Sequence, residues 1–176
     1  MLKKLLTASM ALALSSNVWA YGAPYVGVSS GIKTNTANIV NFRGVPGNLF
    51  FGYGANLDSN FYLAGEIFGT AGTITIKDNG LKSTWAYGLS FLPGLMISDH
   101  TMAFARLSLM RTHFTPSAAG SSQASGVQLG VGLQTSLTQN WDLRGEYDYT
   151  GYKTVSGVSG SPRGDDFRLG LVYKFD

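Results

Sequence analysis

Side chains of opposite character alternate along residues 141–152, WDLRGEYDYTGY. Asp142, Arg144, Glu146 and Asp148 take even positions, and mostly aromatic or aliphatic residues stand between them. A period of two is typical of a β-strand whose two faces meet different environments. The pattern predicts a strand but leaves its orientation open, since the polar face lies outside in a soluble sandwich and inside in a membrane barrel.

The same alternation recurs along the chain and predicts eight strands, near 25–32, 48–57, 61–76, 83–97, 101–114, 125–137, 141–152 and 165–175. Short polar connections are expected at 58–60, 98–100 and 138–140. Longer connections, rich in Gly, Ser, Thr, Asn or Pro, are expected at 33–47, 77–82, 115–124 and 153–164. Alternating short and long connections are typical of an up-and-down antiparallel barrel whose ends face different compartments.

The make-up of the two faces indicates which one meets lipid. Along 127–137 the odd positions are mainly Val and Leu, and the even positions are Gln, Gly and Ser. A soluble sandwich needs a densely charged exterior, and these polar faces are too rich in glycine for that. The narrow lumen of an eight-stranded barrel suits small residues and a few paired charges. We therefore predict an all-β, eight-stranded antiparallel up-and-down transmembrane β-barrel, with a water-soluble sandwich or lipocalin-like binder as the alternative.

The composition also agrees with a protein whose outer surface contacts lipid. The chain is 44% hydrophobic and only 13% charged, with 23 glycines. No run of 18 apolar residues is present after the N-terminal segment, so no helical span is expected. Aromatic residues are expected in two interfacial belts. One belt is Phe61, Trp141, Tyr173 and Phe175 at the short-turn end, and the other is Trp85, Tyr87, Tyr149 and Phe167 nearer the long loops.

Residues 1–20 have the features of a secretory signal peptide: Lys3 and Lys4, a short apolar stretch and a small residue, Ala20, at the expected cleavage point. The barrel domain is then 21–176. Two of the 13 cations belong to the signal, which leaves 11 against 10 acids and removes the main support for a nucleic-acid partner. Without cysteine the chain is neither a disulfide scaffold nor a thiolate metal site.

The last predicted strand contains RLGLVYKF, residues 168–175, and the preceding hairpin contains GVGLQTSLTQNWDLRGEYDY, residues 130–149. The first segment resembles the C-terminal assembly signal of outer-membrane barrels, with Arg168, Gly170, Tyr173 and Phe175 in its positions. The second resembles the strand-turn-strand of small OmpA-like and opacity-type barrels. The chain departs from the pattern at Asp176, which follows the last aromatic residue, and at Pro93, which interrupts a predicted strand.

This resemblance implies a location and a route of biogenesis. It implies a monomer in the outer membrane of a Gram-negative bacterium, with its long loops facing outside. It also implies that periplasmic chaperones keep the chain unfolded and that the barrel assembly machinery inserts it. No cofactor is expected.

The predicted polar faces bring charges into the barrel from four strands: Glu66, Arg106, Arg144, Glu146, Asp148 and Arg168. Unpaired charges in a narrow lumen are costly, so we expect a hydrogen-bonded network of ion pairs. Such a network acts either as a plug that fills the lumen or as a gate that opens a thin passive channel. The plug is the preferred interpretation because small barrels fill their interiors with side chains.

Cationic residues gather at the expected long-loop end: Lys33, Arg43, Lys77, Lys82, Arg111, Lys153 and Arg163. Cations suit contact with lipopolysaccharide phosphates, and the alternative is a solvated rim without a specific partner. Recognition of a host or cell-surface ligand by the loops at 33–47 and 115–124 also stays open. The preferred function is therefore structural or surface-interactive: membrane integrity, lipopolysaccharide contact and loop-mediated adhesion.

A lipid A-modifying enzyme is the least favoured alternative. Such an enzyme needs a nucleophile, a histidine base and an acid that orients it. His100 is expected in a short turn, which leaves His113 as the only credible base, near Thr112, Thr115 and Ser117. The His-x-Ser-Asn spacing of lipid A deacylases is absent, because Phe114, Thr115 and Pro116 follow His113. We expect neither catalytic residues nor a metal site.

Overall fold

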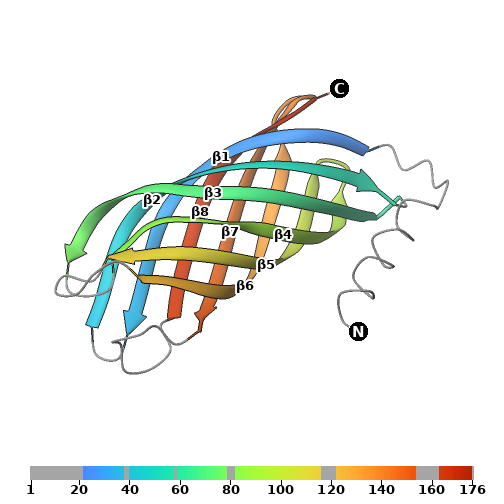
Figure 1. Ribbon diagram of the computed structural model, residues 1–176. Helices are drawn as coiled ribbons and strands as arrows, with labels where there is room; N and C mark the ends of the chain where they lie inside the picture. The colour runs from blue at the N-terminus through green and yellow to red at the C-terminus, as the bar shows by residue number, and fades with distance from the viewer. Residues whose placement is uncertain are drawn as a thin grey trace, which may run out of the picture.

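The computed structural model describes residues 22–37, 40–57, 59–78, 82–115, 122–153 and 163–175. They form a closed antiparallel barrel in which every strand pairs with its neighbour in sequence and β8 pairs with β1 (Figure 1). The strands are β1 Gly22–Ala37, β2 Val40–Asn56, β3 Phe61–Asp78, β4 Lys82–Ser98, β5 Thr101–Thr115, β6 Ser122–Ser136, β7 Trp141–Tyr152 and β8 Arg163–Lys174. The predicted eight-stranded fold is confirmed, and the predicted signal peptide lies outside the described residues.

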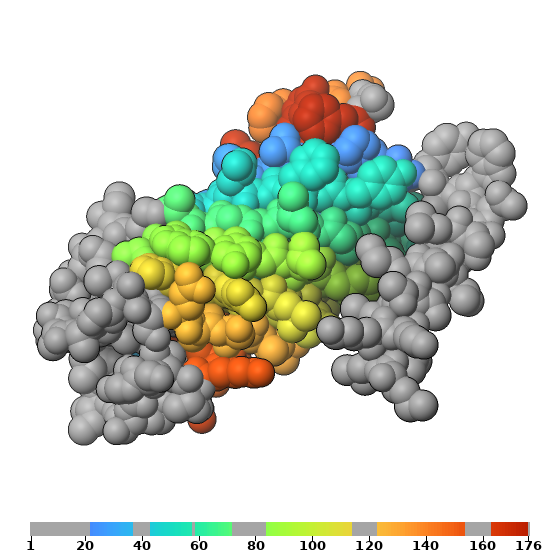
Figure 2. Space-filling model, in the orientation of Figure 1, coloured from blue at the N-terminus to red at the C-terminus, as the bar shows by residue number. Residues whose placement is uncertain are grey.

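The bulky face of each strand points outward. On β6, Leu133 is 54% exposed and its neighbour Gln134 is 8% exposed. The burial of β7 alternates in the same way, with Asp142, Arg144, Glu146 and Asp148 inside. Figure 2 shows one side of the resulting outer surface. None of the described residues belongs to a helix long and apolar enough to cross a membrane.

The strands run further toward the long-loop end than the sequence predicted. Residues 33–37 and 40–47, expected in a loop, continue the β1–β2 ladder from Ser30↔Gly47 to Ala37↔Val40. The prediction of an irregular 33–47 loop was therefore wrong, and the other three long connections are shorter than expected. The Gly and Pro residues that suggested a loop instead lie at irregular points of β2. There the register with β3 shifts, between Arg43 and Gly44 and between Pro46 and Gly47.

Six of the strands are longer than a bilayer requires. Strands β1 to β6 have 15 to 18 residues, whereas a tilted strand crosses the hydrocarbon with about 9–11. The additional length includes the segments next to the long connections, such as 33–37 and 40–47 of the β1–β2 ladder.

Pro93 stays inside β4 without a bulge. It pairs with Leu63 of β3, and the β4–β5 register has the same offset at Phe91↔Leu107 as at Gly94↔Phe104. Between these two pairs, Leu92 and Pro93 have no partner on β5. Pro93 thus removes a ladder interaction and leaves the alignment of the strands unchanged.

The seam between β1 and β8 closes the barrel through a close approach of two backbones. A Cβ atom placed on Gly170 would lie 2.6 Å from both the Cβ of Ser29 and the carbonyl oxygen of Val28. A Cβ on Gly31 would fall on the carbonyl oxygen of Phe167. Glycine at these two positions allows the strands to pair in this register.

Candidate functional site: the charged lumen and the outer rim

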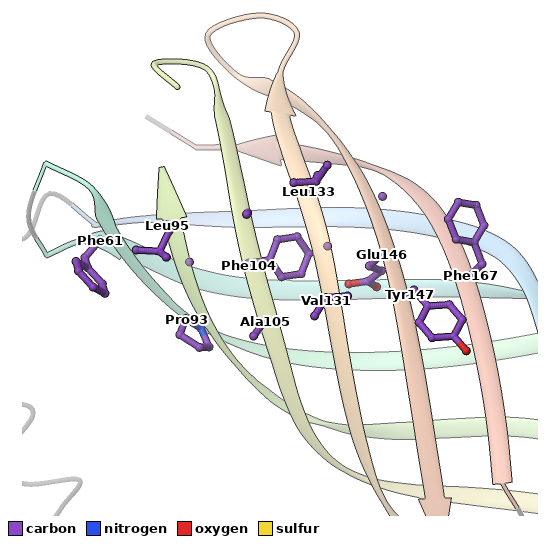
Figure 3. A pocket seen from close by; sticks show the side chains of 14 residues that line it. Phe61, Pro93, Leu95, Phe104, Ala105, Val131, Leu133, Glu146, Tyr147 and Phe167 are labelled. Atoms are coloured by element: carbon purple, nitrogen blue, oxygen red, sulfur yellow. The ribbon is translucent and has the colours of Figure 1, made fainter. Parts of the chain in front are cut away.

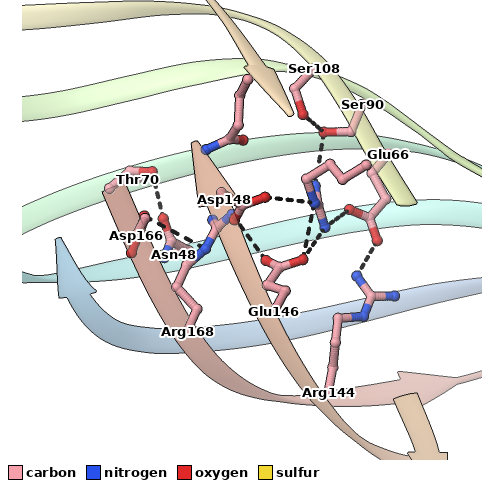
Figure 4. A network of polar contacts seen from close by, with 12 residues as sticks. Asn48, Glu66, Thr70, Ser90, Ser108, Arg144, Glu146, Asp148, Asp166 and Arg168 are labelled. Atoms are coloured by element: carbon pink, nitrogen blue, oxygen red, sulfur yellow. Dashed lines mark hydrogen bonds and ion pairs between the residues drawn. The ribbon is translucent and has the colours of Figure 1, made fainter. Parts of the chain in front are cut away.

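The six charges predicted to face the lumen all do so. Glu66 comes from β3, Arg106 from β5, Arg168 from β8, and the other three, Arg144, Glu146 and Asp148, from β7. Each residue is at most 4% exposed, and Figure 4 shows the side chains of Glu66, Arg144, Glu146, Asp148 and Arg168 converging inside the barrel. Their common location follows from parity, since even positions of these strands point inward.

Glu66 joins two of the arginines. Its Oε2 atom lies 2.8 Å from Nη2 of Arg106, and its Oε1 atom accepts a hydrogen bond from Nη1 of Arg144. The hydroxyl of Tyr25 also donates to Oε1 at 2.8 Å. The carboxylate therefore bridges β1, β3, β5 and β7 across the lumen.

Arg106 extends the network in two directions. Its Nε and Nη2 atoms each lie 3.0 Å from Oε2 of Glu146. Its Nη1 atom donates to Oγ of Ser90 at 2.8 Å, and Ser90 is hydrogen-bonded to Ser108 at 2.9 Å. Every side of this guanidinium thus meets a polar group, as a buried charge requires.

Arg168 forms the outer part of the network, nearer the long-loop end. Its Nη2 atom lies 3.0 Å from Oε1 of Glu146 and donates to Oδ2 of Asp148, and its Nε atom lies 3.6 Å from Oδ2 of Asp166. Asp166 was not among the predicted charges. The signal was present, because Asp166 lies two residues before Arg168 and so shares its face of the strand.

Arg144 lies among aromatic rings at the short-turn side of the network. The centre of its guanidinium is 4.8 Å from the ring of Phe50, 5.2 Å from that of Phe104 and 5.6 Å from that of Tyr25. These distances are within the range of cation–π interactions. Apolar side chains also fill part of the lumen, among them Leu92 and Val172, both fully buried.

A second polar chain, which sequence reasoning missed, continues to the short-turn end. Nε of Arg144 donates to Oε1 of Gln134 at 2.8 Å, and Nε2 of Gln134 donates to Oδ2 of Asp142 at 2.6 Å. Lys174 lies 2.9 Å from Oδ1 of Asp142. The pairing of β6, β7 and β8 brings the side chains of Gln134, Asp142 and Lys174 together. Only the register between these strands reveals this chain of contacts.

Lys33 corrects one prediction. It was expected among the outward cations, yet it is 4% exposed, and its Nζ donates to the Tyr152 hydroxyl at 3.3 Å inside the barrel. The reason is that β1 continues past residue 32, so the alternation of the strand turns Lys33 inward. Its pairing partner on β8 is Asp166, so a positive charge stands beside a carboxylate-rich part of the lumen.

The remaining predicted cations divide into two groups. Arg43, Arg111, Lys153 and Arg163 are exposed near the long-loop end. The backbones of Lys77 and Lys82 belong to β3 and β4, and their side chains lie outside the described part of the structure. Four cations are therefore available on the outside at this end.

The residues of the resemblance to an assembly signal divide between the two faces of β8. Arg168 and Gly170 point inward, whereas Tyr173 and Phe175 point outward at the short-turn end. Tyr173 contacts Trp141 and Phe175 edge to face, with ring centroids 5.1 Å apart in both pairs. The backbone N–H of Phe175 donates to the carbonyl of Pro24 at 3.0 Å. The aromatic residues thus sit beside the first strand, where the barrel closes.

His113 is on the outside of β5, stacked on Trp85 with ring centroids 5.2 Å apart. Thr112, its neighbour in sequence, faces the lumen and is 1% exposed. The two side chains therefore point to opposite faces, which excludes Thr112 as a nucleophile activated by His113. Thr115 lies at the end of β5 with its side chain undescribed, and Ser117 lies outside the described residues. Within the described ranges, no three His, Cys, Asp or Glu side chains form a group that could hold a metal ion.

Apolar grooves lie on the outer surface of the described part of the barrel, and two of them are compared below. The first lies over β3 to β8 in the short-turn half and is bordered by Phe61, Leu95, Val131, Leu133, Tyr147 and Phe167 (Figure 3). Small residues such as Ala105 and Gly145 leave it hollow. The second groove lies over β3 to β7 nearer the long-loop end, and Arg111 and Lys153 are among its lining residues.

Comparison with known proteins finds a matching family and solved structures with a similar fold. Residues 5–175 match the family described as the outer membrane protein beta-barrel domain. Neisserial surface protein A is similar in structure, with a TM-score of 0.63, 18% identity, and coverage of 88% of this chain and 99% of that one. No curated protein sequence matches the chain.

The attachment invasion locus protein Ail of Yersinia pestis is also similar. Its complex with the heparin analogue sucrose octasulfate gives a TM-score of 0.59 at 14% identity, over 88% of this chain and 99% of that one. Ail alone gives 0.57 at 15% identity, over 88% and 97%. At these identities the likeness shows the fold alone.

Proposed function

Because this chain belongs to the outer membrane protein beta-barrel domain family, we propose that it is an outer-membrane protein with a structural and surface-interactive role. The long-loop end faces the outside of the cell, contacts lipopolysaccharide and presents the loops. The short-turn end faces the periplasm, as expected of barrels with short periplasmic turns.

The filled lumen is the observation that carries this proposal. Charged side chains from β3, β5, β7 and β8 join across it, and buried apolar residues such as Leu92 and Val172 fill further parts of it. Side chains that fill a narrow barrel leave no continuous aqueous path. The work of the protein is then done at its outer surface and at its long-loop end.

The exposed cations support contact with lipopolysaccharide. Four exposed cations lie near the long-loop end: Arg43 on β2, Arg111 on β5, Lys153 just after β7 and Arg163 at the start of β8. Arginine and lysine at the level of the headgroups suit phosphate oxygens. Vesicles of lipopolysaccharide and phosphatidylcholine test this: we expect the folded barrel to bind the lipopolysaccharide, and binding no stronger than to phosphatidylcholine alone would overturn the contact.

Adhesion to a polyanionic surface is a second candidate. The same exposed cations favour it, and Ail, which shares the fold, binds the sulfated heparin analogue sucrose octasulfate. Binding of the purified barrel to immobilised heparin, and loss of that binding after removal of the loops, would support adhesion. Equal retention on an uncharged polysaccharide would count against it.

The passive channel is tested by conductance in planar bilayers. A plug predicts no unitary current for the wild type, because the network is already satisfied by its own ion pairs. A gated pore predicts currents that change in Glu66→Ala and Arg106→Ala. Regular wild-type openings altered by these substitutions would replace the plug with the channel.

The enzyme alternative is tested by lipid A mass. A lipid A-modifying activity predicts altered lipid A in cells that express the barrel, and loss of the alteration in His113→Ala. The placement of His113 against Trp85, with Thr112 on the opposite face, supports unchanged lipid A as the expected result.

A further inference from the structure

The second outer groove has a row of polar and cationic residues at its upper border. Tyr87 of β4 pairs with Arg111 of β5, and Arg111 pairs with Ser125 of β6. The backbone N–H of Lys153, the residue after the end of β7, donates to the carbonyl of Ser125 at 2.9 Å, which places Lys153 beside Ser125. Arg111 and Lys153 therefore flank a small side chain, with their backbones about 10 Å apart across β6.

An apolar column lies directly below this row. Leu89 pairs with Leu109, Leu109 with Val127 and Val127 with Gly151. Leu109 is 65% exposed, and a Cβ atom on Gly151 would meet nothing within 4 Å. The small residues Ser125 and Gly151 thus leave a hollow of about 1010 Å³ between bulky neighbours.

A third cation stands at the edge of the hollow. Arg163 of β8 pairs with Gly151 and is exposed. Among the described residues that line the groove there is no Asp or Glu. The nearest outward carboxylate on β8, Asp165, accepts a hydrogen bond from the Tyr147 hydroxyl at 2.8 Å. The upper border is accordingly positive, and the column below it is apolar.

The first outer groove provides an internal comparison. It is similarly apolar and measures about 780 Å³, but no Lys or Arg is among its described lining residues. Any lipid-facing hollow fills with acyl chains. Only the second groove adds cations above the hollow, where a headgroup would lie.

We propose that the groove bordered by Arg111 and Lys153 is a specific binding site for lipid A, the diphosphorylated and multiply acylated anchor of lipopolysaccharide. This inference deepens the proposed function and rests on it. The separated cations Arg111, Lys153 and Arg163 suit a ligand with more than one phosphate. The groove crosses the outer faces of β3 to β7, about 19 Å at the usual strand spacing, which gives room for several acyl chains side by side. A two-chain phospholipid with one phosphate would occupy only part of the width of the groove and contact only some of its cations.

The test measures lipid bound to the full barrel in phosphatidylcholine nanodiscs, by native mass spectrometry, with added lipid A, monophosphorylated lipid A or phosphatidylglycerol. In Arg111→Ala/Lys153→Ala we expect lipid A affinity to fall at least tenfold, as the loss of charge-assisted hydrogen bonds implies. Gly151→Phe fills the hollow and should lower it as well, because open space surrounds that position. Asp99→Ala, which removes an exposed charge from the turn between β4 and β5 at the opposite end of the barrel, is the control and should stay within twofold.

The outcomes separate the site from the function. If wild type and all variants bind lipid A equally and above phosphatidylcholine, the site is overturned and lipopolysaccharide contact stands. If phosphatidylglycerol binds as tightly as lipid A and both depend on Arg111 and Lys153, the assignment to lipid A is overturned. If the wild type shows no preference for lipid A, both proposals fail. Cold and boiled gel mobility verifies that each variant is folded.

Discussion

Arg106 and Glu146 are 40 residues apart in sequence, yet two nitrogens of the Arg106 guanidinium each lie 3.0 Å from one carboxylate oxygen of Glu146. The pair joins β5 to β7 across the lumen, since β6 stands between them in the wall. Both side chains are below 5% exposed. The contact therefore ties together strands that share no ladder.

Arg106→Met tests the worth of this tie. The substitution leaves the buried carboxylates Glu146 and Glu66 short of a partner, which should cost about 3–5 kcal/mol of unfolding free energy. Urea unfolding in lipid vesicles measures it.

The double variant Arg106→Met/Glu146→Leu serves as the control for that experiment. It removes one charge of each sign, so we expect it to be more stable than the sum of the two single changes implies. Additive losses would show that the two side chains do not stabilise each other.

Arg144→Lys tests the planar shape of the guanidinium. Lysine keeps the charge but cannot donate to Glu66 and Gln134 while lying among three aromatic rings. We expect a loss of about 1.5–3 kcal/mol, the value of one charge-assisted hydrogen bond. Stability equal to the wild type in the same urea titration would mean that charge alone matters at this position.

Gly31→Ala tests the closure of the barrel. The added Cβ collides with the backbone of Phe167, so the β1–β8 seam should fail to form and the fraction folded from urea into vesicles should drop sharply. Gly65→Ala is the matched control, because a Cβ there meets nothing within 4 Å. A cold-versus-boiled gel reads both, and equal folding of the two variants would show that the seam tolerates a side chain.

Spin labels at Leu129→Cys and Gln128→Cys test the orientation of the faces. The chain has no native cysteine, so each label is unique. Leu129 is 56% exposed and Gln128 is 3% exposed. Oxygen dissolved in lipid should relax the label at position 129 strongly and the label at position 128 weakly. The reverse order would show that the polar face of β6 contacts lipid and the apolar face lines the lumen.

The alternation of residue types was enough to predict the strands and the faces. Glu66, Arg106, Arg144, Glu146, Asp148 and Arg168 could be assigned to the lumen because a strand turns every second side chain to the same side. Strand ends were less predictable. The Gly and Pro residues at 44, 46 and 47 resemble a loop locally, and only pairing with β1 and β3 shows that they belong to a strand with irregular register.

The sequence by itself therefore determined the barrel, its lipid-facing side and the identity of most buried charges, because those depend on a period of two along each strand. The tertiary structure decided which charges meet. It joined Arg106 to Glu146 and Glu66, turned Lys33 inward and set Ser125 between Arg111 and Lys153. These contacts depend on the register between strands far apart in sequence, and a shift of two residues would keep every face and change every partner.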